Sequence, residues 1–259
     1  MDFVINRGQR IAYDAAGAGD DTVVLLAGLG TRRTDWADAG YVAGLADEFR
    51  VVSIDSLGHG DSDSPADCSL YTPRQRVGDV IAVLDRIGGG GVHVIGYSMG
   101  GWIAAAMIVH APERLHSVCV GGWDPVRGMA GVRERLGIDL DFDMVMGGFR
   151  STYPQLTAWI TPDREPALRC CFSAVDDLNG VEYALDACEL PILLWDGVAD
   201  PHHDGSRELA AQLRTAEFVE TPGDHAAAFF DEGGEAVTAL RAFLHGTSQT
   251  RPRRSPAPT

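Results

Sequence analysis

Lysine is absent from this chain, and all 21 of its basic residues are arginine. A Schiff-base lysine, the phosphate-binding lysine of a P-loop and a serine–lysine catalytic pair are therefore excluded. Any serine nucleophile in this protein must take its base from another residue type. Positive charge is also scarce, because 37 acidic residues leave a net charge of -16. Nucleic acid and anionic membrane surfaces are consequently poor partners for the protein.

Targeting signals and long apolar runs are missing as well. The first residues show neither a basic segment nor a long apolar stretch, and no run approaches the ~20 apolar residues that a membrane span needs. Cysteine is sparse, with five residues at irregular spacing. We therefore expect no membrane span, reduced thiols and a cytoplasmic location. None of these features indicates an oligomeric state.

Short apolar runs alternate with helical patterns along most of the chain. Strands that alternate with helices imply right-handed crossovers and a parallel sheet, so the fold class is α/β. An N-terminal hairpin is expected from residues 3–5 and 11–13. The expected strands are 22–27, 51–55, 92–95, 115–120, 190–195 and 217–219, and the expected helices are 41–48, 73–87, 99–107, 207–213 and 232–245.

The alternation stops between residues 123 and 188, where no strand pattern is visible. We predict a core in two parts, 1–122 and 189–246, and a mainly helical cap or lid insertion at 123–188. The insertion would lie over the carboxyl ends of the strands, where ligands bind in open α/β folds. Residues 247–259, rich in Ser, Thr, Pro and Arg, are expected to form a disordered tail.

The pentapeptide Gly96-Tyr97-Ser98-Met99-Gly100 lies between a β-branched strand pattern and an Ala-rich helix pattern. A strand that turns sharply into a helix through G-x-S-x-G is a nucleophile elbow. The turn strains the serine backbone and crowds the flanking positions, which favours glycine there. We therefore predict that Ser98 is a nucleophile.

A serine nucleophile needs a base, and the base needs an orienting acid. His225 follows the last expected strand and is our candidate base. Asp200, which follows the strand ending at Trp195, is the first choice of acid, and Asp124 is the alternative. The neighbouring run His202-His203-Asp204 lacks a recognised ligand spacing, so we expect solvated histidines and no metal site.

Donors for an oxyanion are expected on two backbone segments. Ala27-Gly28-Leu29-Gly30 follows an early strand, and its small residues let the backbone approach a substrate closely. The amides of Leu29 and Met99 are the candidate donors. His59, within Asp55-Ser56-Leu57-Gly58-His59-Gly60-Asp61-Ser62, precedes the nucleophile in the chain and is interpreted as structural.

Across residues 1–246 the chain resembles the α/β-hydrolase superfamily. The resemblance rests on the elbow at Ser98, the segments 27–30 and 55–62, Asp200, and Asp224-His225. It implies a mostly parallel eight-stranded sheet flanked by helices, a helical cap, and catalysis without a cofactor. Family members usually carry His-Gly-x-Gly where this chain has Ala27 in place of the histidine. Serine at the elbow argues against epoxide hydrolases and dehalogenases, which carry Asp there.

The resulting hypothesis is a serine esterase acting on a small to medium apolar ester through an acyl-enzyme. Gly28, Tyr97, Trp123 and Trp159 are candidate pocket residues, and further apolar cap residues would complete the pocket. The same triad could serve an enol-lactonase, a perhydrolase or a carbon–carbon bond hydrolase, and a ligand sensor on a hydrolase scaffold is the alternative of another class. A carbon–carbon hydrolase would use cap arginines for a substrate carboxylate, and the candidates are Arg127, Arg133, Arg135, Arg150, Arg164 and Arg169.

Overall fold

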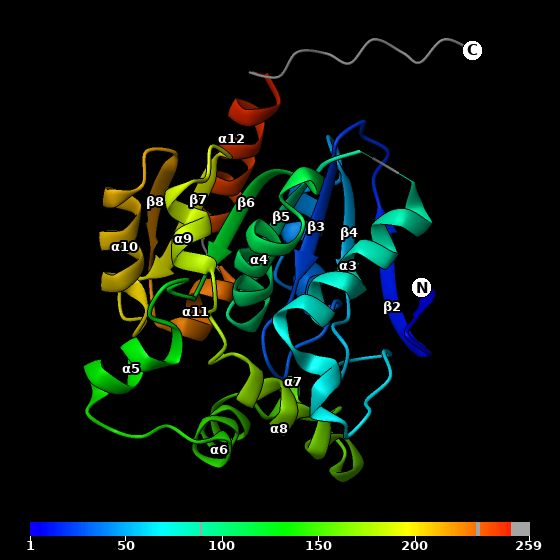
Figure 1. Cartoon of the computed structure of the whole chain (residues 1–259), viewed down its shortest axis with the longest axis vertical. Coiled ribbons are helices and arrows are strands. Elements are labelled where there is room, and N and C mark those ends of the chain that lie inside the picture. Colours follow the sequence, from blue (N-terminus) through cyan, green and yellow to red (C-terminus); the bar gives the residue numbers. More distant parts are fainter. Residues whose placement is uncertain (89, 232–233, 250–259) are drawn as a thin grey trace.

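A computed structural model describes residues 1–88, 90–231 and 234–249 of the chain. Its centre is an eight-stranded sheet with the order β1-β2-β4-β3-β5-β6-β7-β8 (Figure 1). Strand β2 runs antiparallel to β1 and β4, and the remaining neighbours are parallel. The strands are β1 Asp2–Asn6, β2 Gln9–Ala16, β3 Thr22–Leu26, β4 Arg50–Ile54, β5 Val92–Tyr97, β6 Leu115–Gly121, β7 Ile192–Gly197 and β8 Ala216–Thr221. The predicted α/β class with a mostly parallel sheet is confirmed.

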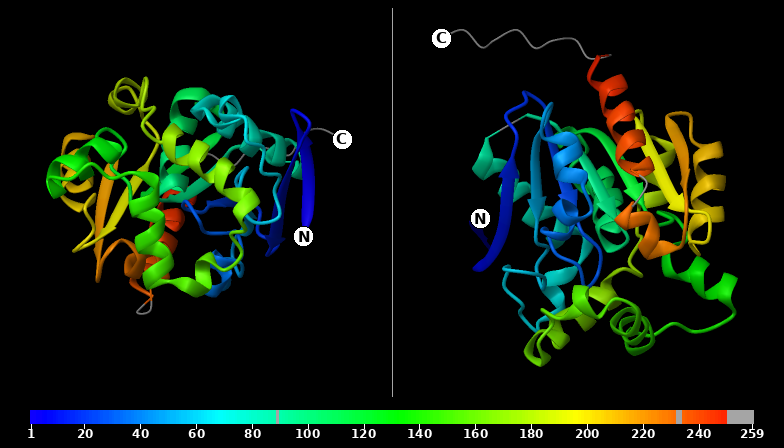
Figure 2. Two further views of the ribbon diagram at one scale, coloured as in Figure 1. Left: turned by 90° about the horizontal axis from the view of Figure 1, so that it is seen from below. Right: turned by 180° about the vertical axis from the view of Figure 1, so that it is seen from behind.

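Helices cover both faces of the sheet (Figure 2). Residues of α3, α4, α9 and α10 belong to the apolar core on one face, and residues of α1, α2, α11 and α12 belong to the core on the other. Coverage on both sides explains why β3, β5 and β7 are buried along their whole length and read as continuous apolar runs. Among the described helices, none combines the length and apolar character that crossing a bilayer requires. The core helices are α1 Asp35–Asp38, α2 Tyr41–Leu45, α3 Pro73–Ile87, α4 Met99–His110, α10 His203–Gln212, α11 His225–Phe230 and α12 Glu235–Gln249, with 3-10 turns η1 Cys68–Tyr71 and η2 Pro112–Arg114.

Segment 123–188 connects β6 to β7 and is helical. Its helices α5 to α8 lie beyond the carboxyl ends of the strands, below the sheet in Figure 1, whereas α9 packs against α4. Its division from the rest as a separate cap remains a prediction. The elements are α5 Gly128–Leu136, α6 Phe142–Thr152, α7 Pro154–Thr157, η3 Pro162–Arg164, α8 Glu165–Ala174 and α9 Val181–Asp186.

The C-terminal helix is longer than the sequence suggests. Leu240 and Leu244 of α12 are fully buried against the sheet, and the Thr247 hydroxyl donates a hydrogen bond to the Leu244 carbonyl at 2.9 Å. Residues 247–249 are therefore helical, which corrects the expected start of a disordered tail. The rest of that tail, 250–259, and the predicted helix start at Glu232 lie outside the described residues.

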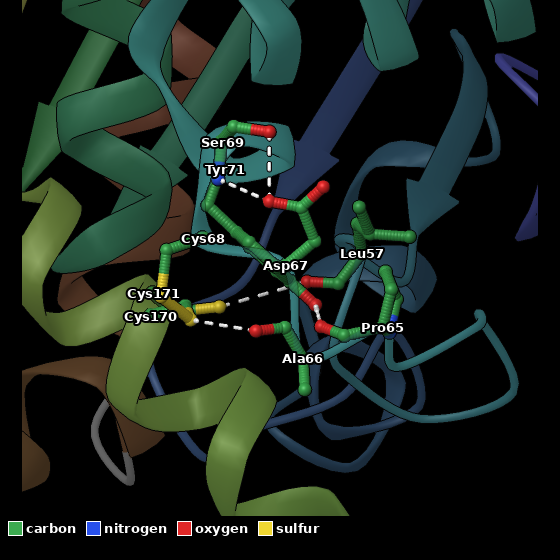
Figure 3. The surroundings of a disulfide bond; sticks show 9 residues. All are labelled: Leu57, Pro65, Ala66, Asp67, Cys68, Ser69, Tyr71, Cys170 and Cys171. Atoms are coloured by element: carbon green, nitrogen blue, oxygen red, sulfur yellow. Dashed lines mark hydrogen bonds between the residues drawn. A yellow bond between two sulfur atoms is a disulfide. The ribbon is translucent and has the colours of Figure 1, made fainter.

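The expectation of reduced thiols is wrong for one pair of cysteines. Cys68 in η1 and Cys170 in α8 form a disulfide, with Cα atoms 4.8 Å apart (Figure 3). The bond ties segment 123–188 to the turn that precedes α3. Cys119, Cys171 and Cys188 are free thiols. The two partners are 102 residues apart in the chain, so nothing in their local spacing indicated the pairing.

Removing this disulfide should destabilise the fold. A cross-link that closes a loop of 102 residues restricts the unfolded chain strongly, so Cys68→Ser should lower the free energy of unfolding by up to about 4 kcal/mol. Urea denaturation under non-reducing conditions measures the change. Cys188→Ser, which removes a free thiol, is the control and should cost little. Unchanged stability of the wild type after full reduction would contradict the prediction.

Candidate active site

Ser98 lies at the turn from β5 into α4 with φ 55° and ψ −120°. Few non-glycine residues adopt a positive φ, and such strain concentrates at functional sites. A Cβ at Gly96 would collide with the Gly100 carbonyl, and one at Gly100 would collide with the Leu26 carbonyl. The Ser98 N–H donates to the Gly121 carbonyl at 2.7 Å. Neighbouring backbone thus holds the serine in the elbow conformation.

Asp200 and His225 are in direct contact. Asp200 follows β7, and His225 begins α11 directly after the loop that follows β8. Nδ1 of His225 lies 2.7 Å from Oδ2 of Asp200. The second oxygen, Oδ1, accepts a hydrogen bond from the His202 backbone N–H at 2.8 Å. Both oxygens of a fully buried carboxylate are therefore satisfied.

Charge and burial set the protonation of this pair. Burial disfavours the imidazolium, but Asp200 outweighs it and raises the pKa of His225 above its ordinary value. Burial would raise the pKa of Asp200 too, yet the charge and hydrogen bond of His225 bring it below its usual range. Burial and the nearby Asp200 raise the pKa of the buried Asp196 well above its ordinary value. Asp200 is thus the ionised partner of the histidine.

Asp124 is not brought to His225. Its Oδ1 accepts hydrogen bonds from the backbone N–H groups of Val126 and Arg127, both at 2.9 Å. The carboxylate therefore caps the turn that enters α5. Of the two acids considered from the sequence, the structure brings Asp200 to the imidazole.

Two further residues support the pair and were not assigned this role from the sequence. The Tyr97 hydroxyl donates to the His225 carbonyl at 2.6 Å, and the ring centroids are 5.3 Å apart. His202 accepts a hydrogen bond at Nδ1 from the Asp124 backbone N–H at 3.2 Å. Burial lowers the pKa of His202 to about 4, which keeps it neutral. The only signal in the sequence was position, since Tyr97 directly precedes Ser98 and His202 lies two residues after Asp200.

The expectation that His202 and His203 are solvated is wrong. Both are buried, with 5% and 6% exposure. His203 begins α10, and its Nε2 pairs with Glu220 of β8 at 2.7 Å. In the described part of the chain, no group of three or more His, Cys, Asp or Glu side chains could hold a metal ion.

The candidate oxyanion donors lie beside Ser98. Met99 is the first residue of α4, and the first N–H groups of a helix have no partner within it. A Cβ at Gly28 would lie 3.2 Å from Cβ of Ser98, so the 28–30 loop passes close to the serine. Nε2 of His59 accepts a hydrogen bond from the Gly30 N–H at 3.1 Å. His59 thus supports this loop, in keeping with the structural role inferred from the sequence.

Ser98 and His225 line one cavity of about 480 Å³. Gly28, Leu29, Tyr97, Met99 and Trp123 also line it. Most of its remaining wall is apolar and comes from segment 123–188 and α11: Met129, Val132, Leu140, Met144, Val145, Met146, Phe149, Phe172, Val175, Phe229 and Phe230. Trp159, a candidate pocket residue from the sequence, instead turns its indole Nε1–H to the Gly30 carbonyl at 3.1 Å.

The six arginines considered for a substrate carboxylate all have other partners. Five of them form ion pairs with acidic residues, namely Arg127 with Glu134, Arg133 with Asp176, Arg135 with Asp204, Arg150 with Glu165 and Arg169 with Asp143. Arg164 donates to the Ser64 hydroxyl at 2.9 Å. Among the described residues, those that line the Ser98 cavity include no arginine.

Comparison with known proteins gives a consistent result. A family model described as "Alpha/beta hydrolase family" matches residues 23–240. The chain is 38% identical over 113 residues to the dihydrolipoyllysine-residue acetyltransferase component of an acetoin cleaving system from Cupriavidus necator, which covers 44% of this chain and 29% of that protein. It is 35% identical over 119 residues to a 2-hydroxy-6-oxononadienedioate/2-hydroxy-6-oxononatrienedioate hydrolase from Burkholderia vietnamiensis, which covers 44% of this chain and 40% of that one.

A solved structure extends the likeness over the whole fold. The enol-lactonase from Burkholderia xenovorans superposes with a TM-score of 0.73 at 24% identity, over 94% of this chain and 100% of the other. At 24% identity this match is evidence for the fold only. The two curated relatives are matched over less than half of their own lengths.

The Asp200–His225 contact makes a testable prediction. Asp200→Asn should lower kcat on an ester by a factor on the order of 10⁴, by analogy with serine proteases, because the imidazole loses its orienting carboxylate. The raised pKa of His225 would also fall, so the acid limb of kcat/KM should move to lower pH. Measuring kcat and kcat/KM over a pH series for the wild type and Asp200→Asn tests both effects, with Asp124→Asn as the control. A large loss in Asp124→Asn and none in Asp200→Asn would contradict the assignment.

Proposed function

The chain belongs to the alpha/beta hydrolase family, and from that premise we propose that it is a serine hydrolase. Its substrate in this proposal is a small to medium, uncharged, apolar carboxylic ester, cleaved through an acyl-enzyme. One observation carries the proposal. The hydrogen bond from His225 to Asp200 holds an imidazole of raised pKa in the wall of the same apolar cavity that Ser98 lines.

Acylation would proceed by general base catalysis. Nδ1–H of His225 donates to Asp200, which leaves Nε2 to take the proton from the Ser98 hydroxyl as Oγ attacks the ester carbonyl. The Leu29 and Met99 amides would donate to the oxyanion of the tetrahedral intermediate. When this intermediate collapses, the C–O bond breaks and His225 returns the proton to the leaving alcohol.

Deacylation would repeat the same steps with water. His225 takes a proton from the water as its oxygen attacks the acyl carbonyl, and the tetrahedral intermediate again uses both amides. Collapse releases the acid and returns the proton to Ser98. Because Asp200 is ionised and fully buried, it stabilises the imidazolium that forms in each half-reaction.

The apolar lining of the cavity favours an uncharged substrate over one that carries a carboxylate. Placing an unpaired carboxylate in an apolar site is costly unless a cation or several donors meet it. The six arginines of segment 123–188 have other partners, and Asp224 adds an acidic group to the wall. This argues against a carbon–carbon bond hydrolase acting on a diacid. A lactone is a cyclic ester and fits the same proposal.

We also propose that segment 123–188 acts as a cap. It supplies much of the apolar wall, from α5, α6 and α8, and it lies over the carboxyl ends of the strands (Figure 1). Closing such a segment over a bound ester would exclude water and strengthen the electrostatic interactions around Ser98.

Covalent labelling tests the nucleophile. A fluorophosphonate should form a single adduct on Ser98, found by intact mass and peptide mapping, and Ser98→Ala should abolish labelling and lower ester hydrolysis by several orders of magnitude. Ser69→Ala, which removes an exposed serine in η1, is the control. Labelling of Ser98 without turnover on any ester would indicate a ligand sensor instead. An adduct at another serine would contradict the nucleophile.

A matched pair of esters tests the charge preference. p-Nitrophenyl pentanoate and mono-p-nitrophenyl glutarate have acyl chains of the same length, but the second ends in a carboxylate. We expect kcat/KM to be about 100-fold lower for the glutarate, because its carboxylate would be desolvated without a cation. Equal values for the two esters would show that the cavity accepts acids and would reopen the carbon–carbon hydrolase alternative.

A further inference from the structure

The loop that carries Leu29 is hydrogen-bonded on two sides through its next residue, Gly30. The Gly30 N–H donates to Nε2 of His59 at 3.1 Å. The Gly30 carbonyl accepts from the Trp159 indole Nε1–H, also at 3.1 Å. Gly30 is buried and has a φ of 77°. The two bonds fix the peptide groups on either side of a residue that could otherwise rotate freely.

The His59 bond belongs to the core. His59 is 1% exposed, and its Nδ1 lies 3.4 Å from the Leu57 carbonyl, which leaves Nε2 as the acceptor. Burial, together with the charge of Arg76, lowers the pKa of His59 to about 3. The ring is therefore neutral at any pH at which the enzyme would be assayed. The Gly30 N–H therefore has its partner outside segment 123–188, and the His59 ring also packs against the ring of Trp159, with centroids 5.9 Å apart.

The Trp159 bond belongs to segment 123–188. Trp159 lies in the turn between α7 and η3. The Arg164 guanidinium lies 5.5 Å from the centroid of its ring, and the same arginine donates to the Ser64 hydroxyl at 2.9 Å. Ser64 and Gly30 lie outside the segment, so the Arg164–Ser64 and Trp159–Gly30 hydrogen bonds form only while the segment lies over the strand ends. The Gly30 carbonyl thus has its indole donor only when the segment is in that position.

A chain of hydrogen bonds leads from the indole to the oxyanion amide. Thr31 donates to the Gly28 carbonyl twice, from its backbone N–H at 3.3 Å and from Oγ1 at 2.9 Å. The Gly30 carbonyl and the Thr31 N–H belong to one planar peptide, and the Gly28 carbonyl and the Leu29 N–H belong to another. Fixing each carbonyl therefore fixes the direction of the N–H across the same peptide. Hydrogen bonds in such a chain also polarise one another.

We propose that Trp159 is a positioning residue that couples closure of segment 123–188 to assembly of the oxyanion site, an inference that rests on the proposed function. With the segment closed, the indole holds the Gly30–Thr31 peptide, and Thr31 in turn aims the Leu29 N–H at the oxyanion. With the segment lifted, the outer donor is lost and the Leu29 peptide can turn. Both candidate amides can therefore stabilise the transition state only when segment 123–188 covers the bound ester.

Trp159→Phe tests the coupling by removing the donor and keeping an aromatic ring. The kcat on p-nitrophenyl pentanoate should fall about 10-fold, less than the 10²–10³-fold loss that follows removal of a whole oxyanion donor. The KM should stay within twofold, since ground-state contacts are kept. The Ki of an alkyl trifluoromethyl ketone, which forms a tetrahedral adduct on serine, should rise by the same factor as kcat falls.

Trp102→Phe is the matched control. The Trp102 indole N–H also donates to a backbone carbonyl, that of Asp177 at 2.9 Å, outside the chain of bonds that reaches Leu29. The Trp102→Phe variant should leave the ratio of the ketone Ki to the KM of the ester unchanged. Thr31→Val is a second variant, independent of whether Trp159→Phe folds, and should show the same loss of kcat with KM kept. The double variant should lose less than the product of the two single losses.

The outcomes separate the two proposals. Unchanged kcat and ketone Ki in folded Trp159→Phe, with Ser98→Ala inactive, would overturn the coupling and leave the serine hydrolase standing. A raised KM with kcat unchanged would make Trp159 a substrate contact and would also overturn the coupling. A wild type that neither hydrolyses esters nor reacts with a fluorophosphonate would overturn the proposed function and the coupling together.

Discussion

Ser98 adopts a backbone conformation, φ 55° and ψ −120°, that an isolated chain would rarely populate. Such a conformation costs of order 1–3 kcal/mol and persists only where the surroundings determine it. Here β5 is wholly buried and α4 is buried along nearly its whole length, so their packing offsets the strain. The close approach of Gly100 to the Leu26 carbonyl ties the elbow to the end of β3. That contact also brings the 28–30 loop beside the serine, so the proposed nucleophile and the proposed oxyanion donor Leu29 depend on the same packing.

Most charged side chains near the site are paired with other residues and do not face the cavity. The protein carries a net charge of -16, yet the wall of the cavity is mainly apolar. The fully buried Asp200 does not line the cavity and contacts His225, which does. Arginines are used to join segments rather than to face the cavity. Arg33 is the strongest case, because it is buried and bonds to Asp14, Asp55 and Asp61. It thereby connects the loop after β3 to the loop after β4, the two loops that meet at the Gly30–His59 hydrogen bond.

Segment 123–188 is attached to the rest of the protein at several points with different physical character. The disulfide from Cys170 fixes α8 covalently to η1 (Figure 3), whereas Trp159 is attached to the 28–30 loop by a single hydrogen bond to the Gly30 carbonyl. Helix α6, which lies between α5 and α7 in the chain, contributes a large part of the apolar wall of the cavity. In the proposed cap, the covalent anchor at α8 would let the turn that holds Trp159 move while α8 keeps its position on the core. In our proposal, the Trp159 hydrogen bond is the attachment that breaks, and it is the one connected to the candidate oxyanion amide of Leu29.

The sequence by itself determined the parts of the protein that depend on neighbours in the chain. Apolar runs predict buried strands, the Gly spacing around Ser98 predicts the elbow, and the positions of Asp200 and His225 after successive strands bring them to one edge of a parallel sheet. Contacts between segments with no repeating pattern could not be predicted in this way. The pairing of Cys68 with Cys170, the burial of His202 and His203, the partners of the arginines and the bond from Trp159 to Gly30 all depend on how irregular segments pack. Only the tertiary structure decided these, because such packing is set by three-dimensional fit and not by the spacing of residues along the chain.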